Sequence, residues 1–217
     1  KKLKANDKIA KNQFEIIEKI LNELSAGNNI QIDEFKDIEQ DFILKLNLIS
    51  TKPTMYICNV DEESINKGNS FSKKVVEYAE KNNSCVVFVS ASIEAQIAGL
   101  DNDDEKIEFL KELNLDESTL KKVIKTGYSL LNLINYFTCG PKETRSWTIY
   151  KNTCAPQAAG KIHTDFEKGF IRAETVSFDD YVKYDGESNS REAGKLRQEG
   201  KDYIVKDGDV MNFLFNV

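Results

Sequence analysis

The hydrophobic positions near the start of the chain have helical spacing. Along residues 2–25 most of them lie three or four residues apart, which predicts one amphipathic helix with a heptad-like stripe. Gly27 and the asparagines after it end this helix. The stripe consists of Leu3, Ala10, Phe14, Ile17, Leu21 and Leu24. No other segment carries a matching long heptad, so the partner helix is expected outside this sequence or on another molecule. A second, short helix is predicted over 33–45.

The pattern changes between residues 52 and 92. Segments 52–60 and 84–92 each contain a run of consecutive apolar residues, which is typical of buried strands. Segment 70–82 between them has its apolar residues on one helical face. A strand, a helix and a strand of these lengths predict a βαβ unit with parallel strands. Two strands cannot form a stable parallel sheet alone, so more strands are expected elsewhere.

The remainder of the chain divides into helices followed by short strands. Helices are predicted over 101–113, where acidic residues suit a helix N-terminus, and over 116–134. After them the pattern predicts strands at 134–139, 145–150, 170–177, 203–206 and 210–215, with a short helix at 155–163. This order indicates a small α+β module of the β-grasp type.

Composition and charge exclude several classes of protein. The 217 residues are 40% hydrophobic and 30% charged, with a net charge of −6, which argues against nonspecific binding of DNA or RNA. There is no apolar run long enough for a membrane span and no signal peptide, so a cytoplasmic protein without a membrane partner is expected. The chain opens at Lys1, not methionine, inside a helical pattern, so we expect a piece of a longer protein.

The cysteines do not predict a metal centre. No two of them form a C-x-x-C pair, which disfavours a zinc site, and a chain of this size needs no disulfides. We expect buried, reduced thiols at Cys58, Cys85, Cys139 and Cys154.

Segment 155–170, "APQAAGKIHTDFEKGF", invites a search for chemistry because it holds the chain's only histidine, His163. Gly160-Lys161 does not complete a phosphate-binding loop, since Ile162 follows the lysine and Ala155 stands where the first glycine is required. As a catalytic base His163 would need a nucleophile or an orienting carboxylate at hand. Asp165 is near in sequence, but two residues on need not mean adjacent, so a structural role is expected. We therefore predict no catalytic residue and no metal ligand in this chain.

Longer segments carry a family resemblance. The stretches 136–174 and 193–217, together with "KPTMYICNV" and "SASIEAQIAGL" upstream, closely resemble the YchF family of Obg-related P-loop nucleotidases. The resemblance implies an α/β plus α+β protein in three parts. Residues 1–50 would be the returning half of a helical coiled-coil arm, and 51–131 the C-terminal part of the nucleotide-binding domain with connecting helices. Residues 132–217 would be a TGS domain of the β-grasp (ubiquitin-like) type. The phosphate-binding loop, the switch regions and the Mg²⁺ ligands would lie before Lys1.

The resemblance also indicates a base-recognition motif. "NVDE" (59–62) follows a predicted strand where related GTPases carry N-K-x-D: Asn59 is kept, Val60 replaces the lysine, and Glu62 replaces the aspartate. "SAS" stands where S-A-K is usual and adds Ser90, Ala91 and Ser92. Each segment alone reads as a polar loop after a strand. Both follow parallel strands, however, at the edge where open α/β sheets bind ligands. The family's similar variant of the motif accompanies a preference for ATP over GTP.

The function implied by this resemblance is that of a ribosome-associated ATPase that uses ATP and Mg²⁺ in the intact protein. This chain alone is expected to be inactive, because phosphoryl transfer requires a phosphate cradle and a metal. Two alternatives remain: a non-enzymatic adaptor for RNA or protein, and the regulatory TGS region of a tRNA synthetase or alarmone enzyme. Residues before Lys1 would distinguish them.

Contact with RNA would have to be local, because acidic and basic residues are nearly balanced in the C-terminal module. Candidates for a basic and aromatic patch are Arg145, Trp147, Arg172 and Arg197. For Trp147 a place in the hydrophobic core is the favoured interpretation.

Overall fold

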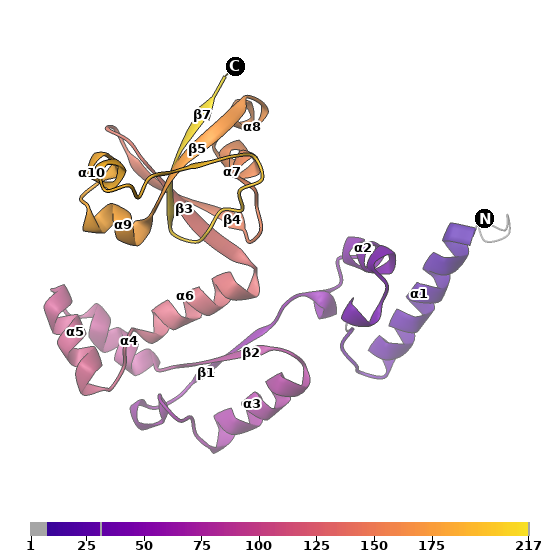
Figure 1. Cartoon of the computed structure of the whole chain (residues 1–217). Helices are drawn as coiled ribbons and strands as arrows, with labels where there is room; N and C mark the ends of the chain where they lie inside the picture. The colour runs from indigo at the N-terminus through magenta and orange to yellow at the C-terminus, as the bar shows by residue number, and fades with distance from the viewer. Residues whose placement is uncertain (1–7, 31, 217) are drawn as a thin grey trace. The chain divides into compact units, whose positions relative to one another are not determined.

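A computed structural model of the chain describes residues 8–30 and 32–216 (Figure 1). Their contacts define two compact units, Lys1–Leu115 and Asp116–Val217. The contacts group helix α6 (Thr119–Leu130) with the C-terminal unit. Within the described residues, no helix is long and apolar enough to cross a membrane.

The first helix, α1 (Lys8–Ser25), has two apolar faces. Ile16 and Ile20 are buried in a small core, and the other buried members of that core are Ile30, Phe35 and Ile43. The predicted stripe is a different face: four of its residues, Phe14, Ile17, Leu21 and Leu24, are exposed, with Leu21 60% exposed. Leu3 lies outside the described residues. The helix is therefore packed on one face within this chain and has a second apolar face in solvent.

The predicted helix over 33–45 is wrong in its first part. A 3₁₀ helix, η2 (Ile32–Glu34), comes first, and α2 (Asp37–Lys45) follows. The break arises because Phe35 enters the core and Lys36 has an extended backbone, with its N–H donating to Glu39 Oε2 at 3.3 Å. A further 3₁₀ turn, η3 (Ile49–Thr51), follows α2.

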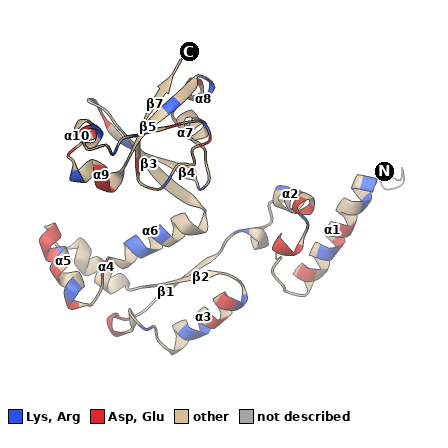
Figure 2. Cartoon of the chain, viewed as in Figure 1, with Lys and Arg blue, Asp and Glu red and all other residues tan. Residues whose placement is uncertain are grey.

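The predicted βαβ unit is present. Strands β1 (Met55–Asn59) and β2 (Cys85–Val89) pair in parallel and are connected through η4 (Glu62–Ser64) and α3 (Ser70–Lys81). Both strands are free of charged residues (Figure 2). Helices α4 (Ala91–Ala98) and α5 (Asp103–Glu112) follow, and α4 was not predicted.

The prediction that both strands are buried is wrong in degree: no residue of β1 is fully buried, and β2 has one buried residue. Ile57 is 52% exposed, whereas Val87 on β2 is buried. Both strands are edges of this sheet, because the described residues place no further strand beside either of them.

The C-terminal unit contains a five-stranded mixed sheet. The strands are β3 (Leu133–Cys139), β4 (Thr144–Tyr150), β5 (Phe170–Ser177), β6 (Arg197–Glu199) and β7 (Asp209–Phe215). Their order is β4-β3-β7-β5-β6, with β3 and β7 parallel at the centre and the other neighbours antiparallel. The helices that follow β4 are α7 (Ala155–Ile162), α8 (Thr164–Lys168), α9 (Phe178–Lys183) and α10 (Glu187–Glu192). Tyr136 of β3 is fully buried, and its hydroxyl donates to the carbonyl of Ala158 on α7 at 2.8 Å.

The predicted strand at 203–206 is wrong. This segment makes only an isolated bridge, between Ile204 and Cys154, and the strand in this region is β6. Its backbone bonds to the loop before α7: the Tyr203 carbonyl accepts from Ala155 N–H at 2.9 Å, and Val205 N–H donates to Thr153 at 3.0 Å.

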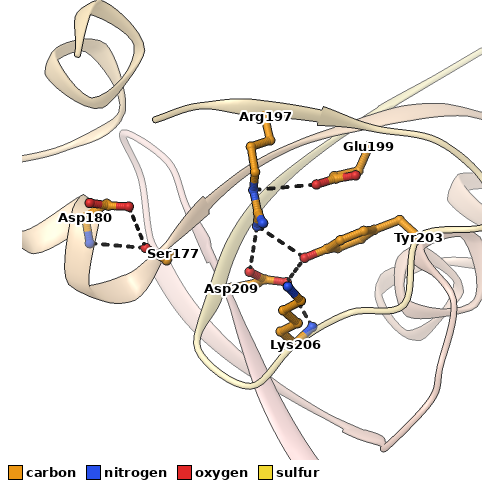
Figure 3. A network of polar contacts seen from close by, with 7 residues as sticks. All are labelled: Ser177, Asp180, Arg197, Glu199, Tyr203, Lys206 and Asp209. Atoms are coloured by element: carbon orange, nitrogen blue, oxygen red, sulfur yellow. Dashed lines mark hydrogen bonds and ion pairs between the residues drawn. The ribbon is translucent and has the colours of Figure 1, made fainter. Parts of the chain in front are cut away.

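A buried carboxylate holds the loop between β6 and β7 (Figure 3). Asp209 is 3% exposed and accepts three hydrogen bonds. The donors are Arg197 Nη2 at 3.2 Å, the Tyr203 hydroxyl at 2.7 Å and the Lys206 backbone N–H at 2.9 Å. Arg197 also pairs with Glu199 at 3.5 Å.

Candidate base-recognition site

The two predicted segments meet at the carboxyl edge of the two-stranded sheet. Asn59 is the last residue of β1, and Val60 N–H donates to the Val89 carbonyl at the end of β2 at 2.8 Å. Because the strands are parallel, α4 begins immediately beside this end. The Ala91 backbone N–H donates to Asn59 Oδ1 at 3.0 Å. This bond joins the loop after β1 to the first turn of α4.

Glu62 makes the second connection. Its Oε1 accepts from the Ser92 hydroxyl at 2.8 Å and from Gln96 Nε2 at 2.8 Å, and Gln96 Nε2 lies 3.3 Å from Ser92 Oγ. The neighbouring Asp61 points elsewhere, since its Oδ1 accepts the Ser64 N–H and caps η4. Glu62 is therefore the acidic residue of this loop that contacts α4.

Gln96 was not among the predicted site residues. It follows Ser92 by four positions on α4, and residues at that spacing share a helix face. The spacing was available from the sequence, but only the closure of the β1 loop onto α4 shows that Gln96 reaches the carboxylate.

Two of the six predicted residues are buried. Val60 packs in a core with Ile65, Ile93 and Leu115, so its side chain is not available to lie along a base. Ser90 is 1% exposed, and its hydroxyl has no hydrogen-bond partner among the described residues. The residues that face solvent are Asn59, Glu62, Ala91 and Ser92.

A pocket of about 370 Å³ opens beside β1. Asn59 and Val60 contribute to its lining, together with Asn69 and Phe71 near the start of α3. Glu62 and the α4 residues do not line it. The pocket and the Glu62 carboxylate are thus separate features that share the end of β1.

The segment 155–170 is structural. Lys161 is exposed in the last turn of α7, as expected for a solvated helix end. His163 caps α8 by accepting the Asp165 N–H at Nδ1 (3.2 Å). At Gly160 a Cβ would meet the Glu167 side chain, so this glycine permits α7 and α8 to pack closely. These contacts agree with the structural reading of the segment.

The predicted basic and aromatic patch is only partly assembled. The Arg145 guanidinium lies 4.2 Å from the Trp147 ring centre, while Arg197 is bound to Asp209. Trp147 is half-buried against the core of the C-terminal unit and donates to Thr138 Oγ1 at 2.9 Å. Trp147 is thus at the border of the core and Arg145 is its neighbour.

The four cysteines are free and half-buried, so the expectation that they are fully buried is wrong in degree. Among the described residues there is no group of three or more His, Cys, Asp or Glu side chains that could hold a metal ion.

Comparison with known proteins supports a common ancestry over the whole chain. A family model named YchF-GTPase_C, described as a protein of unknown function, matches residues 133–216. The ribosome-binding ATPase YchF of Escherichia coli O157:H7 is 54% identical over 217 residues, covering 100% of this chain and 59% of that protein. The Bacillus subtilis protein of the same name is 44% identical over 216 residues, covering 99% and 59%.

A solved structure agrees. The Schizosaccharomyces pombe YchF GTPase superposes with a TM-score of 0.79 at 36% identity, covering 96% of this chain and 56% of that one. The chain therefore spans less than two thirds of the length of these relatives. Their names differ in the nucleotide, since one kind is called an ATPase and the other a GTPase.

Proposed function

The chain belongs to the YchF family, and on that premise we propose that it supplies the base-recognition edge of a ribosome-associated nucleoside-triphosphate hydrolase that prefers ATP. The observation that carries this proposal is the joining of the two loops at the carboxyl ends of β1 and β2. Asn59 holds the start of α4, and Glu62 is held by Ser92 and Gln96. Ligands of open α/β sheets bind at this edge.

The hydrogen bonds to Glu62 favour adenine over guanine. A carboxylate can accept about four hydrogen bonds, two on each oxygen. Ser92 and Gln96 already occupy Oε1, so Oε2 is the oxygen with accepting capacity left. The adenine edge offers one amino group, at N6, whereas guanine presents two donors side by side, N1–H and the 2-amino group. One oxygen can serve adenine. The two guanine donors are parallel and pair best with one carboxylate oxygen each, so with Oε1 already occupied one of them lacks an oxygen in line with it.

The size of the preference for ATP over GTP follows from the guanine donor that lacks an acceptor. A donor without a partner costs about 1–3 kcal/mol, which corresponds to roughly 5- to 150-fold in affinity. Asn59 supports the same arrangement from the other loop, because its bond to Ala91 fixes the first turn of α4 and with it Ser92. The Mg²⁺ and phosphate contacts of hydrolysis are assigned to other parts of the intact protein.

The other parts of the chain are proposed to have the roles that the YchF family implies. Residues 132–217 are proposed as a TGS domain of the β-grasp type, which is supported by the sheet order with parallel β3 and β7 at its centre. Residues 1–50 are proposed as the returning half of a coiled-coil arm, supported by the exposed apolar face of α1. A ribosome partner is proposed because the relatives are named ribosome-binding.

The test compares nucleotide affinity in the full-length protein. We expect the wild type to bind ATP about tenfold or more tightly than GTP, and Gln96→Leu to reduce that ratio by about fivefold or more, because Oε1 regains accepting capacity. Glu62→Gln should weaken ATP binding, since the amide presents a different donor pattern to the base. Isothermal titration calorimetry with a non-hydrolysable analogue of each nucleotide measures all of these affinities.

Glu63→Gln is the matched control, because Glu63 is the exposed neighbour of Glu62 in η4, whereas the bonds to Ser92 and Gln96 are made by Glu62. The ratio of ATP affinity to GTP affinity in this variant should equal that of the wild type. Stronger binding of GTP than of ATP by the wild type would contradict the preference. No effect of Glu62→Gln on either nucleotide would remove this edge from base recognition and leave the non-enzymatic adaptor as the better interpretation.

A further inference from the structure

Strand β4 is an open edge of the C-terminal sheet. It stands at one end of the order β4-β3-β7-β5-β6, with seven residues, while the strand at the other end, β6, has three. Natural proteins protect edge strands by keeping them short or by placing proline, inward-pointing charges or bulges on them. β4 pairs with β3 in continuous register from Thr144 to Tyr150 and contains no proline. It is therefore a long and regular edge.

The backbone groups on the outer side of β4 can be assigned from the pairing. Lys151 N–H donates to the Asn132 carbonyl at one end, and Gly140 N–H donates to the Glu143 carbonyl at the other. In an antiparallel pair, hydrogen-bonded and non-hydrogen-bonded residue pairs alternate. Between these ends, the residues of β4 that bond to β3 are Arg145, Trp147 and Ile149. The N–H and C=O groups of Ser146 and Thr148 consequently point away from β3.

A groove of about 540 Å³ runs along this outer side. It is lined by most of β4, including Ser146, Trp147, Thr148 and Tyr150, and by Lys161 from the end of α7. Tyr150 is 68% exposed. The groove thus combines unpaired backbone groups with aromatic side chains and the end of a helix.

The charged residues of the groove are all basic. Arg145 and Lys161 line it and no carboxylate does. Neither of these two cations forms an ion pair within the described part of the chain. Their charges remain available to a partner, although the whole chain has a net charge of −6.

We propose that this groove binds an extended, acidic peptide segment of a partner protein, which adds to the sheet as a strand beside β4. The peptide's backbone would bond to Ser146 and Thr148. Its side chains would alternate between the face of the sheet that carries Arg145 and Trp147 and the opposite face, which carries Tyr150. Its carboxylates would lie near Arg145 and Lys161. A peptide fits these observations better than single-stranded RNA, because only a polypeptide offers alternating N–H and C=O groups at the spacing of the strand edge.

The experiment selects from a displayed random-peptide library on the full-length protein. We expect enriched sequences that contain Asp or Glu alternating with apolar residues. Chosen peptides should bind at least about tenfold more weakly when alternate backbone amides are N-methylated, since the strand bonds are then lost. In NMR spectra of the complex, the Ser146 and Thr148 amides should show slowed hydrogen exchange.

Two variants locate the site on the protein. Ser146→Pro removes an outward N–H that β3 does not use, a place where edge strands tolerate proline, and it should abolish peptide binding. Ser146→Ala keeps that N–H and should bind normally. Lys161→Glu should weaken binding, whereas Lys168→Glu, an exposed lysine outside the groove, should not.

Three outcomes would overturn the proposal. They are the absence of any enriched peptide, enriched peptides that bind equally well after N-methylation, and a single-stranded oligouridylate probe that binds the groove in place of the peptides. The comparison of N-methylated with unmodified peptides uses the wild-type protein, so it tests the strand bonds even if Ser146→Pro does not fold.

Discussion

Gly169 connects the beginning of β5 to the end of β7 through direct backbone contact. Its carbonyl accepts the Asn216 N–H at 2.9 Å, and a Cβ added at Gly169 would lie 1.9 Å from the Asn216 carbonyl oxygen. That atom belongs to the backbone and cannot rotate away. A side chain at this position therefore has to displace the last residues of the central strand.

We expect Gly169→Ala to lower the free energy of unfolding of the C-terminal unit by about 1–3 kcal/mol, the usual cost of overpacking. Gly127→Ala is the control: it lies inside α6 with nothing within 4 Å of the added Cβ, and it should stabilise by roughly 0.5–1 kcal/mol. Urea unfolding followed by the fluorescence of Trp147, the only tryptophan of the chain, measures both. Equal midpoints for Gly169→Ala and wild type would contradict this packing.

Tyr136 makes the free energy of unfolding depend on pH in the alkaline range. Burial raises the pKa of its phenol above the ordinary value of 10.0. Above about pH 10 the unfolded chain loses this proton while the folded chain keeps it, so the folded state is progressively disfavoured as pH rises. Below about pH 10 both states are protonated and the contribution is constant.

The expected result is a urea midpoint that falls between about pH 10 and about pH 11, with a shallower fall in Tyr136→Phe. At neutral pH the variant should be less stable by about 1 kcal/mol, because the hydrogen bond to Ala158 is lost. Tyr150→Phe, at an exposed position, is the control and should follow the wild-type curve. Parallel curves for Tyr136→Phe and wild type would exclude this source of pH dependence.

Single residues differ in how far the sequence could predict them. The places of Asn59 and Glu62 follow from strand ends and register, which are local. Gln96 could not be assigned in advance, because its role depends on a loop from β1 reaching α4, 34 positions along the chain. The burial of Val60 was missed for the same reason. Residues 59–62 are mostly polar, and their sequence does not show that Val60 packs against Ile93 and Leu115.

At the scale of elements, the loop between β6 and β7 is held by polar contacts. Asp209 accepts from Arg197, Tyr203 and Lys206, which ties the end of one strand to the beginning of another (Figure 3). The same carboxylate helps to raise the pKa of Tyr203, after burial as the larger cause. A loop fixed in this way need not form a strand to be ordered.

Asp209→Asn should therefore destabilise the C-terminal unit by about 2–3 kcal/mol, since the amide offers one acceptor oxygen for three donors and places its own NH₂ against one of them. Asp202→Asn lies in the same loop at an exposed position and should change stability by less than about 0.5 kcal/mol. Hydrogen exchange of the Lys206 amide should accelerate in the first variant and not in the second. Unchanged protection of that amide would show that other contacts hold the loop.

This network also explains which elements the sequence could predict. The long periodic segments, such as α3, β3 and β7, were found because their own residues specify them. Segment 203–206 has strand-like composition but bonds to the loop before α7. Helices α8, α9 and α10 have five or six residues each, too few for a periodic pattern to show.

For the whole molecule, the charge distribution bears on how a ribosome would be contacted. The chain has a net charge of −6, and its C-terminal unit is nearly balanced. In Figure 2, α1 and α3 carry both blue and red, whereas α6 carries blue alone. Two of the three lysines of α6, Lys121 and Lys125, are paired with Glu117. A protein that binds RNA mainly through phosphates releases one counterion for nearly every contact, which makes its affinity fall steeply with salt. This chain lacks the charge for many such contacts.

If the proposed ribosome association depends on protein surfaces such as the β4 groove, its affinity should change little with ionic strength. We expect co-sedimentation of the full-length protein with ribosomes to lose less than about tenfold in affinity between about 50 and 200 mM salt, whereas six to ten phosphate contacts would cost roughly 10³- to 10⁵-fold. Lys161→Glu should weaken binding at every salt concentration, because it removes a contact in the groove, and Lys168→Glu should not. A steep salt dependence shared by both lysine variants would instead assign the association to RNA phosphates, and the groove would then have another partner.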